Sequence, residues 1–482
     1  MKKFLCLIAL LFASVGLVGC VVPGVTPGAT GKTTITFWHA MGQSNQVIIQ
    51  EMIDSFEKAY PMFDVEAVSQ GGYTDLRDKI LNSIPVGEAP TIAQAYPDHI
   101  ANYLNAKAAQ ELDSYIDDTK ALSDYANLHA DFATYTEQVG YTAADKADFV
   151  DAFYAEGAVY DTAGTMYCVP FNKSTEVLFY NLDFFKAHAA DLAQYGVAAD
   201  GTWSKPTWDQ VEGIAKYYLT SAEYNALDAE LKATAAGFSA DSEANLFITL
   251  TQQWGGEYTK FNDKGEGEFA FNNAQSKAAL KFYKDNVDKG YFATATKFGA
   301  DYSSEAFVAG KVIMTIGSSA GASYNVPKDA SFEVGVCAYP QKDMNNPQVI
   351  QQGTNVSLFK CSNPQEELAG WLFMKFLTNF NSSLTWATET GYMPTRVDVL
   401  NSEEYQNYLN GIGVDGLPIY TNNLTTAAQK VALTQQSWFY VNAVFKGSSA
   451  ARDNADMLFD SILYGNKSID DAYKDAIRNL LY

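Results

Sequence analysis

The chain has 482 residues, a hydrophobic fraction of 47% and a formal charge of −23 at pH 7, from 33 Lys and Arg against 56 Asp and Glu. This length and apolar content are enough for two or three domains or lobes, each with its own core. The acidic balance argues against nucleic acid as a partner, because its phosphates would be repelled.

The first 32 residues have the pattern of an export signal followed by a tether. Lys2 and Lys3 precede an apolar run over residues 4–18, which is too short to span a membrane. The stretch LVGC, ending at Cys20, resembles a bacterial lipobox. That resemblance implies a signal peptide over 1–19 and a lipid on Cys20; a plain signal peptide with a nearby Cys is the alternative. Residues 20–32 are rich in Gly, Pro and Thr, which is typical of a flexible tether. We expect an exported protein, anchored to the cell membrane through Cys20 on its periplasmic or extracellular face.

Strand-like and helix-like patterns alternate from residue 33 onward. Residues 35–38 predict a first strand, and apolar residues then recur at helical spacing until Tyr60-Pro61. FDVEAV predicts a second strand, a helix follows from Tyr73, and TIAQAY predicts the next strand. This β-α-β-α-β order favours an α/β fold with a mainly parallel sheet.

Later helices carry recognisable start signals. Thr207 and Gln210 fit a capping box, Ser468 and Asp471 fit a looser one, and Asn363-Pro364 precedes a third helical pattern. No long linker separates two independent halves. The chain therefore fits two interwoven lobes better than two separate domains.

The sequence contains little that indicates catalysis. It has no GxSxG, HExxH, Walker or GxGxxG motif in a suitable context. The four histidines, His39, His99, His129 and His188, show no metal-ligand spacing, and we expect neither a metal nor a cofactor. Carboxylates are so numerous that a glycosidase-like pair remains an alternative.

Beyond the signal and Cys20, the cysteines are Cys168, Cys337 and Cys361, without CxxC spacing. They form either one disulfide or buried free thiols, and we favour the thiols.

Eight stretches in order resemble one protein family. They are ITFWHAM at 35–41, GGYTDL at 71–76, GEAPTIAQAY at 87–96, VPFNKSTEVLFYN at 169–181, PTWDQV at 206–211, AFVAGKVIMTIGSS at 306–319, VGVCAYP at 334–340 and GYMPTR at 391–396. The chain resembles the family 1 extracellular solute-binding proteins, which capture solutes for ABC importers. Within that family it is most similar to the glycerol-3-phosphate binders and more distantly to the maltose binders.

The resemblance implies a periplasmic-binding-protein fold of two interwoven lobes that close on a ligand cleft by a hinge motion. Lobe 1 would hold residues 33–175 and 352–385, and lobe 2 would hold 176–351 and 386–482. The membrane permease subunits of an importer would be the partner, and the protein would act as a monomer.

The same resemblance implies a set of ligand-binding residues. Each offers a stacking face, a hydroxyl or close backbone approach: Tyr73, Ser174, Trp208, Ser318, Gly353 and Tyr392. We add Asp98, which does not match the family's Glu position but lies one step beyond it, as a carboxylate to bind hydroxyls. His39, at the end of the first strand, Gln352 and Arg396 form a second tier. Taken without the resemblance, Trp208 is a first-turn helix residue packed on its own lobe.

Two departures from the glycerol-3-phosphate binders bear on the ligand. Pro97 stands where they have a Glu, with Asp98 one step on, and an alignment by eye places Val444 where they have a phosphate-binding Arg. Since a phosphate favours a bidentate Arg, these departures favour a mono- or oligosaccharide. A glycerol-3-phosphate or glycerophosphodiester is the alternative. A lipid-anchored glycoside hydrolase and a surface adhesin built on the same fold are further alternatives.

Overall fold

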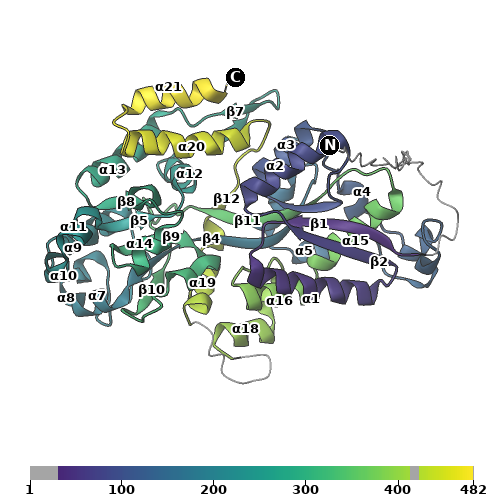
Figure 1. The fold of residues 1–482 in the computed structure, drawn as a ribbon, viewed down its shortest axis with the longest axis horizontal. Coiled ribbons are helices and arrows are strands. Elements are labelled where there is room, and N and C mark those ends of the chain that lie inside the picture. Colours follow the sequence, from purple (N-terminus) through teal and green to yellow (C-terminus); the bar gives the residue numbers. More distant parts are fainter. Residues whose placement is uncertain (1–30, 413–422, 481–482) are drawn as a thin grey trace, which may run out of the picture.

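Two lobes lie side by side and share one sheet (Figure 1). The structure, a computed structural model, describes residues 31–412 and 423–480. The predicted signal peptide, the tether up to residue 30 and Cys20 lie outside the described residues. Strands β4 (Val169–Asn181) and β11 (Val349–Leu358) run through the middle of the molecule and connect the lobes. No described helix has the length and apolar character needed to cross a membrane.

The main sheet is mixed, with the order β2-β1-β3-β11-β4-β9-β5-β8, while β10 pairs with β4 and β12 with β11. The other strands of this sheet are β1 (Thr33–His39), β2 (Phe63–Ser69), β3 (Ile92–Ala95), β5 (Ala236–Ala240), β8 (Phe292–Thr294), β9 (Val312–Ser318), β10 (Val334–Cys337) and β12 (Phe439–Tyr440). A separate hairpin joins β6 (Thr259–Phe261) to β7 (Gly267–Phe269). The predicted parallel pairing is confirmed for β1 with β2 and β3, whereas the two crossover strands pair antiparallel.

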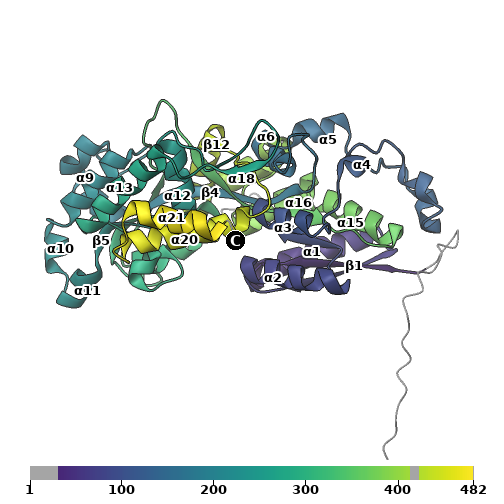
Figure 2. The ribbon, with the colours of Figure 1, turned by 90° about the horizontal axis from the view of Figure 1, so that it is seen from above.

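Helices cover both faces of the sheet (Figures 1 and 2). Those of the first half of the chain are α1 (Gln43–Ala59), α2 (Tyr73–Ser83), α3 (Pro97–Asn105), α4 (Asp113–Ile116), α5 (Ala143–Asp148), α6 (Asp151–Ala155), α7 (Leu182–Ala187), α8 (Ala189–Leu192), α9 (Trp208–Tyr218), α10 (Ala222–Ala226) and α11 (Ala229–Thr234). The later ones are α12 (Glu243–Gln253), α13 (Ala274–Asp288), α14 (Ser303–Val308), α15 (Pro364–Leu377), α16 (Phe380–Thr390), α17 (Val397–Asn401), α18 (Glu403–Leu409), α19 (Asn423–Thr434), α20 (Ser448–Leu463) and α21 (Ile469–Leu480).

Each lobe has its own apolar core. One core takes buried residues from 35–171 and from 356–386, including Phe37, Phe56 and Trp371. The other takes buried residues from 178–350 and from 438–476, including Trp208 and Phe238. Because the chain enters each core twice, neither lobe is a continuous segment, as the absence of a long linker predicted.

The predicted helix starts are confirmed. The Oγ1 of Thr207 accepts from the backbone N–H of Gln210 at 3.3 Å, and the Gln210 side chain accepts in return from the Thr207 N–H at 2.9 Å. Such reciprocal bonds satisfy donors that the helix itself leaves unpaired. Asn363 caps α15, and Ser468 caps α21. The cysteines Cys168, Cys337 and Cys361 are free thiols, the first two buried.

Candidate functional site

A cavity of about 110 Å³ lies where the two lobes meet beside β11. Its walls come from the start of α3 in one lobe and from α12, α20 and the chain around β12 in the other. Helix α20 packs against α3 across this junction (Figures 1 and 2). The cavity is small beside pockets for drug-sized ligands, which are about 300–1,000 Å³. It suits a small solute.

Polar bridges join the lobes next to the cavity. Arg77 of α2 donates from Nη1 to the Ser449 hydroxyl of α20 at 2.8 Å and reaches Asp453 Oδ2 at 3.5 Å. These contacts exist only while α2 and α20 are close together. Arg77 therefore holds the lobes in the approach that this structure shows.

Most of the cavity's lining side chains bear polar groups. The lining includes Tyr96, Pro97, Asp98, Glu156, Asn245, Tyr258, Gln351, Gln352, Gly353, Tyr440, Val444, Ser448 and Arg452. Carboxylate, amide and phenol groups among aromatic rings are suited to bind a hydroxylated solute.

Three of the predicted residues line this cavity. Asp98 is the second residue of α3, with a side chain 14% exposed. Gln352 and Gly353 lie side by side on β11. Gly353 has φ +90°, and a Cβ there would stand 1.8 Å from the carbonyl oxygen of Asn172. Only glycine fits this close crossing of β4 and β11.

Four other predicted residues form two groups beside the cavity. Tyr73 packs on Tyr96 with ring centroids 4.7 Å apart, and its hydroxyl accepts from Asn172 Nδ2 at 3.2 Å. Burial raises the pKa of Tyr73 and of its neighbour Tyr392, so both phenols stay protonated at neutral pH. The second group is a hydroxyl pair, in which Ser318 donates to Ser174 at 3.2 Å. Ser174 pairs in register with Gln352, which ties this pair to the cavity wall.

Two second-tier residues lie outside the cavity lining. His39 is 2% exposed, and its Nδ1 accepts from the Met41 backbone N–H at 3.2 Å. Burial lowers the pKa of His39 to about 4, so the ring is neutral at physiological pH. Arg396 forms ion pairs with Asp148 at 2.7 Å, Asp398 at 3.4 Å and Asp145 at 3.6 Å. Its charge is already compensated there, and it stabilises the local structure.

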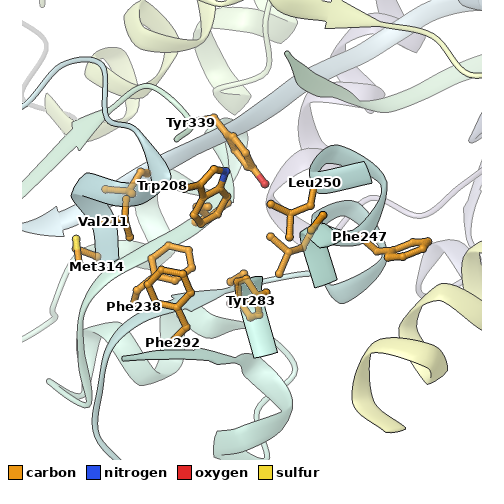
Figure 3. Packing of buried hydrophobic residues seen from close by; sticks show 14 of the residues in the cluster. Trp208, Val211, Phe238, Phe247, Leu250, Tyr283, Phe292, Met314 and Tyr339 are labelled. Carbon is orange, nitrogen blue, oxygen red and sulfur yellow. The ribbon is translucent and has the colours of Figure 1, made fainter. Parts of the chain in front are cut away.

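Trp208 also lies outside the cavity lining, inside the core of its lobe (Figure 3). It has no exposed surface, and its ring packs edge-on against Phe238 and Tyr339 with centroids 5.7 Å and 5.9 Å away. Its Nε1 donates to Gln253 at 2.8 Å. This is the first-turn packing role expected for Trp208 without the family resemblance. With no exposed surface, its side chain offers nothing to a solute in this arrangement.

Replacing Trp208 with Phe should lower the free energy of unfolding by about 1–2 kcal/mol, because it removes apolar volume and the hydrogen bond to Gln253. Solute affinity should stay unchanged. Urea denaturation and calorimetric titration measure the two effects. Weaker binding at unchanged stability would instead support the ligand-contacting role that the resemblance implies.

Sequence reasoning missed Arg452, which lines the cavity from α20. The alignment by eye placed Val444 at the position of the family's phosphate-binding Arg; Val444 lines the cavity too, and an arginine follows eight residues later. The sequence did contain an indication of Arg452. In GSSAAR, small residues typical of a crowded helix start are followed by the one arginine of that segment.

Arg452 is a partly buried cation beside the cavity. Its Nη2 donates to Asn245 Oδ1, and among the described residues it forms no ion pair with a carboxylate. Burial alone would lower the pKa of Arg452, but nearby Asp98, Tyr258 and Tyr96 raise it overall, and it stays charged. A partly buried charge without an ion pair is well suited to an anionic ligand.

Helix ends add to this positive potential. The residues that line the cavity include Pro97 and Asp98 from the first turn of α3, Asn245 near the start of α12, and Ser448, the first residue of α20. The N-terminus of a helix carries a partial positive charge. Asp98 and Glu243 place a carboxylate in the first turns of α3 and α12, whereas the first turn of α20 has no acid. The start of α20 is therefore the helix end that favours a solute with a negative group.

The sequence profile of the bacterial extracellular solute-binding proteins matches residues 51–410. The sn-glycerol-3-phosphate-binding periplasmic protein UgpB of Salmonella typhimurium is 24% identical over 392 residues, which cover 80% of this chain and 79% of that protein.

Solved structures share the fold. UgpB from Mycobacterium tuberculosis in complex with glycerophosphocholine has a TM-score of 0.69 at 18% identity, covering 94% of this chain and 98% of that one. The ABC substrate-binding protein Lmo0181 from Listeria monocytogenes in complex with cycloalternan has a TM-score of 0.69 at 19% identity, covering 93% and 98%. At these identities the likeness is one of fold, and it is the two-lobe fold that the sequence predicted.

Proposed function

This chain belongs to the bacterial extracellular solute-binding proteins, and we propose that the solute it captures for its ABC importer is a small polyol phosphoester. Proteins of this family bind solutes and are not enzymes, so the glycoside hydrolase alternative is withdrawn. The proposal reverses the preference for a sugar, which depended on the apparent lack of a phosphate-binding arginine.

The observation that carries the proposal is Arg452 in the cavity wall. An arginine guanidinium binds phosphate oxygens through two parallel N–H···O bonds, which gives both affinity and orientation. The start of α20, at Ser448, lies at the same wall and favours the same charge. A phosphate bound here would neutralise a cation that now lacks an ion pair.

Polar groups in the rest of the wall suit the polyol part of the solute. Asp98, Asn245 and Gln352 offer a carboxylate and two amides, which accept from or donate to hydroxyls. The small cavity, of about 110 Å³, suits the compact glycerol phosphate unit that sn-glycerol-3-phosphate and glycerophosphocholine share. The relatives named for glycerol-3-phosphate and the fold neighbour bound to glycerophosphocholine support this chemistry.

A mono- or oligosaccharide is the second candidate. Tyr96, Tyr258 and Tyr440 line the cavity, and tyrosine rings stack on the apolar faces of sugars. Asp98 supplies a carboxylate that would accept hydrogen bonds from sugar hydroxyls. The fold neighbour bound to cycloalternan is an example of the fold holding an oligosaccharide.

A thermal-shift panel distinguishes the two candidates. We expect sn-glycerol-3-phosphate or glycerophosphocholine to raise the melting temperature, with about 2.7 kcal/mol of added stability at 100 times the dissociation constant. Maltose, glucose and glycerol serve as neutral controls. Stabilisation by sugars alone would overturn the phosphoester proposal.

We further propose how the lobes are divided, how they close on the solute and how the protein is anchored. The lobe limits are those predicted from the sequence, 33–175 with 352–385 and 176–351 with 386–482. The two cores support them up to residue 385, whereas Trp386 packs in the first core and Arg396 pairs with Asp145 and Asp148 of the first lobe. Solute binding would shift the hinge equilibrium because the solute contacts both lobes at once. The protein would act as a monomer, anchored by lipid on Cys20, and deliver the solute to permease subunits.

A further inference from the structure

Glu176 is a buried acid next to the site, and it is not among the residues proposed to contact the solute. Glu176 of β4 is 2% exposed. Its Oε1 accepts from Asn245 Nδ2 and from Gln352 Nε2, each at 3.2 Å. Its Oε2 is buried and has no hydrogen-bond partner among the described residues. The carboxyl group is thus held by two amides and by no cation.

Glu156 is a buried carboxylate in the same region that does have a cationic partner. It is 5% exposed, and it forms an ion pair with Lys173 and accepts from Gln351 at 2.7 Å and from Asn355 at 3.0 Å. Both described hydrogen bonds to the Glu176 carboxyl group come instead from neutral amides. A carboxylate buried without a counter-ion is strongly disfavoured, so Glu176 takes up a proton.

The two amides that hold Glu176 also line the cavity. Asn245 donates to Glu176 and at the same time accepts from Arg452. Gln352 lies on the crossover strand β11 beside Gly353. Hydrogen bonds therefore connect the carboxyl group to the cation of the site through one side chain.

Several titratable groups from neighbouring elements face Glu176. Asp241, which follows β5, disfavours its ionisation and Arg452 of α20 favours it. Tyr339 and Tyr440 are close enough to interact electrostatically, and Gln435 donates to the Glu176 backbone carbonyl at 3.0 Å. With burial as the largest cause, the pKa of Glu176 is raised to about 8.

We propose that Glu176 is a specificity-determining residue: as a neutral acid it positions Asn245 and Gln352 and leaves the charge of Arg452 to an anionic solute. This inference rests on the proposed function. If Glu176 ionised, its negative charge would oppose a phosphate and partly neutralise Arg452. Anion affinity should therefore fall as the pH rises through the range in which Glu176 loses its proton.

The test compares the wild-type protein with Glu176→Gln, a neutral side chain of the same shape. Isothermal titration with glycerophosphocholine runs from about pH 7 to about pH 9.5, where a phosphodiester does not titrate. Wild-type affinity should fall about tenfold over this range, while Glu176→Gln should change by less than about twofold. Burial raises the pKa of Tyr258 and Tyr440, and that of Asp241 lies at about 6, so these groups keep their charge.

A second measurement needs no solute. The unliganded wild-type protein at pH 7 should show the infrared carbonyl band of a protonated carboxylic acid, which Glu176→Gln lacks. Absence of that difference would overturn the inference, as would an identical pH profile in both proteins. Failure of both proteins to bind any phosphoester at every pH would overturn the proposed ligand class and the inference with it.

Discussion

Replacing Arg452 with Ala is expected to weaken the binding of glycerophosphocholine or sn-glycerol-3-phosphate at least about 30-fold. Removing one partner of a buried, hydrogen-bonded charge pair costs about 2–5 kcal/mol of binding free energy, and each tenfold change in affinity is about 1.4 kcal/mol. Arg452 lines the cavity, and the nearby carboxylates of Asp98 and Asp456 act on it electrostatically without forming an ion pair among the described residues. A bound phosphate would be a counter-charge in direct contact with it. Isothermal titration measures the loss.

Two further variants separate charge from geometry. Arg452→Lys keeps the positive charge but loses the planar fork, and its affinity should lie between those of wild type and Arg452→Ala. Arg478→Ala is the matched control, since Arg478 has a side chain 65% exposed and pairs with Asp475 on its own helix. That control should bind like the wild type. If Arg452→Ala also binds within about threefold of wild type while remaining folded, Arg452 does not bind the solute. That result would favour a sugar as the ligand.

Replacing Lys173 with Met is expected to lower the free energy of unfolding by about 3–5 kcal/mol. Lys173 has no exposed surface, and its ammonium group pairs with Glu156, which is itself 5% exposed. Loss of the lysine leaves a buried carboxylate with only the amides of Gln351 and Asn355, and an unpaired buried charge is strongly destabilising. Urea denaturation, monitored by circular dichroism, gives the difference.

The matched control for this prediction is Lys281→Met. Lys281 and Asp285 form an exposed pair on α13 at 2.7 Å, and its loss should cost no more than about 0.5 kcal/mol. Adding Glu156→Gln to Lys173→Met should recover part of the stability, since it removes the orphaned charge. A cost for Lys173→Met as small as that of Lys281→Met would contradict the assignment of an ionised pair at the crossover.

The ion pair also matters for the site, because it lies where the lobes join. Lys173 pairs in register with Gly353 on the crossover strands, and Glu156 lines the cavity. A weakened pair would loosen the junction on which the proposed lobe closure depends. Lys173→Met is therefore a stability variant with an expected secondary effect on affinity, and both quantities should be measured on the same protein.

Much of the fold was predictable from short stretches of sequence. The capping box at Thr207 and the Asn363-Pro364 start each depend on residues within four positions of one another, and so does the helical spacing of α1. The eight family-like stretches predicted the two-lobe fold. Gly353, which lines the cavity, came from the same resemblance, whereas Asp98 and Gln352 were chosen for their side-chain chemistry next to matched positions.

The position of Arg452 in the cavity wall could not be predicted from local patterns or from the family-like stretches. Residues 441–446 have no regular structure before Gly447, at φ +94°, starts α20, and no periodic pattern fixes an alignment through such a segment. The packing of Trp208 was not determined by local sequence either. Its neighbours in sequence show that it begins a helix, but only the packing of Phe238 and Tyr339 around it shows which way the ring points.

The sequence by itself determined the α/β class, the order of elements at the start of the chain and the family, because periodicity, caps and motifs are local properties. Tertiary structure alone decided the chemistry of the cavity. Glu156 and Glu176 are both buried acids near one junction, yet one meets Lys173 and the other meets two amides. Charge state and ligand preference depend on which distant side chains meet, and that depends on how the two lobes pack together.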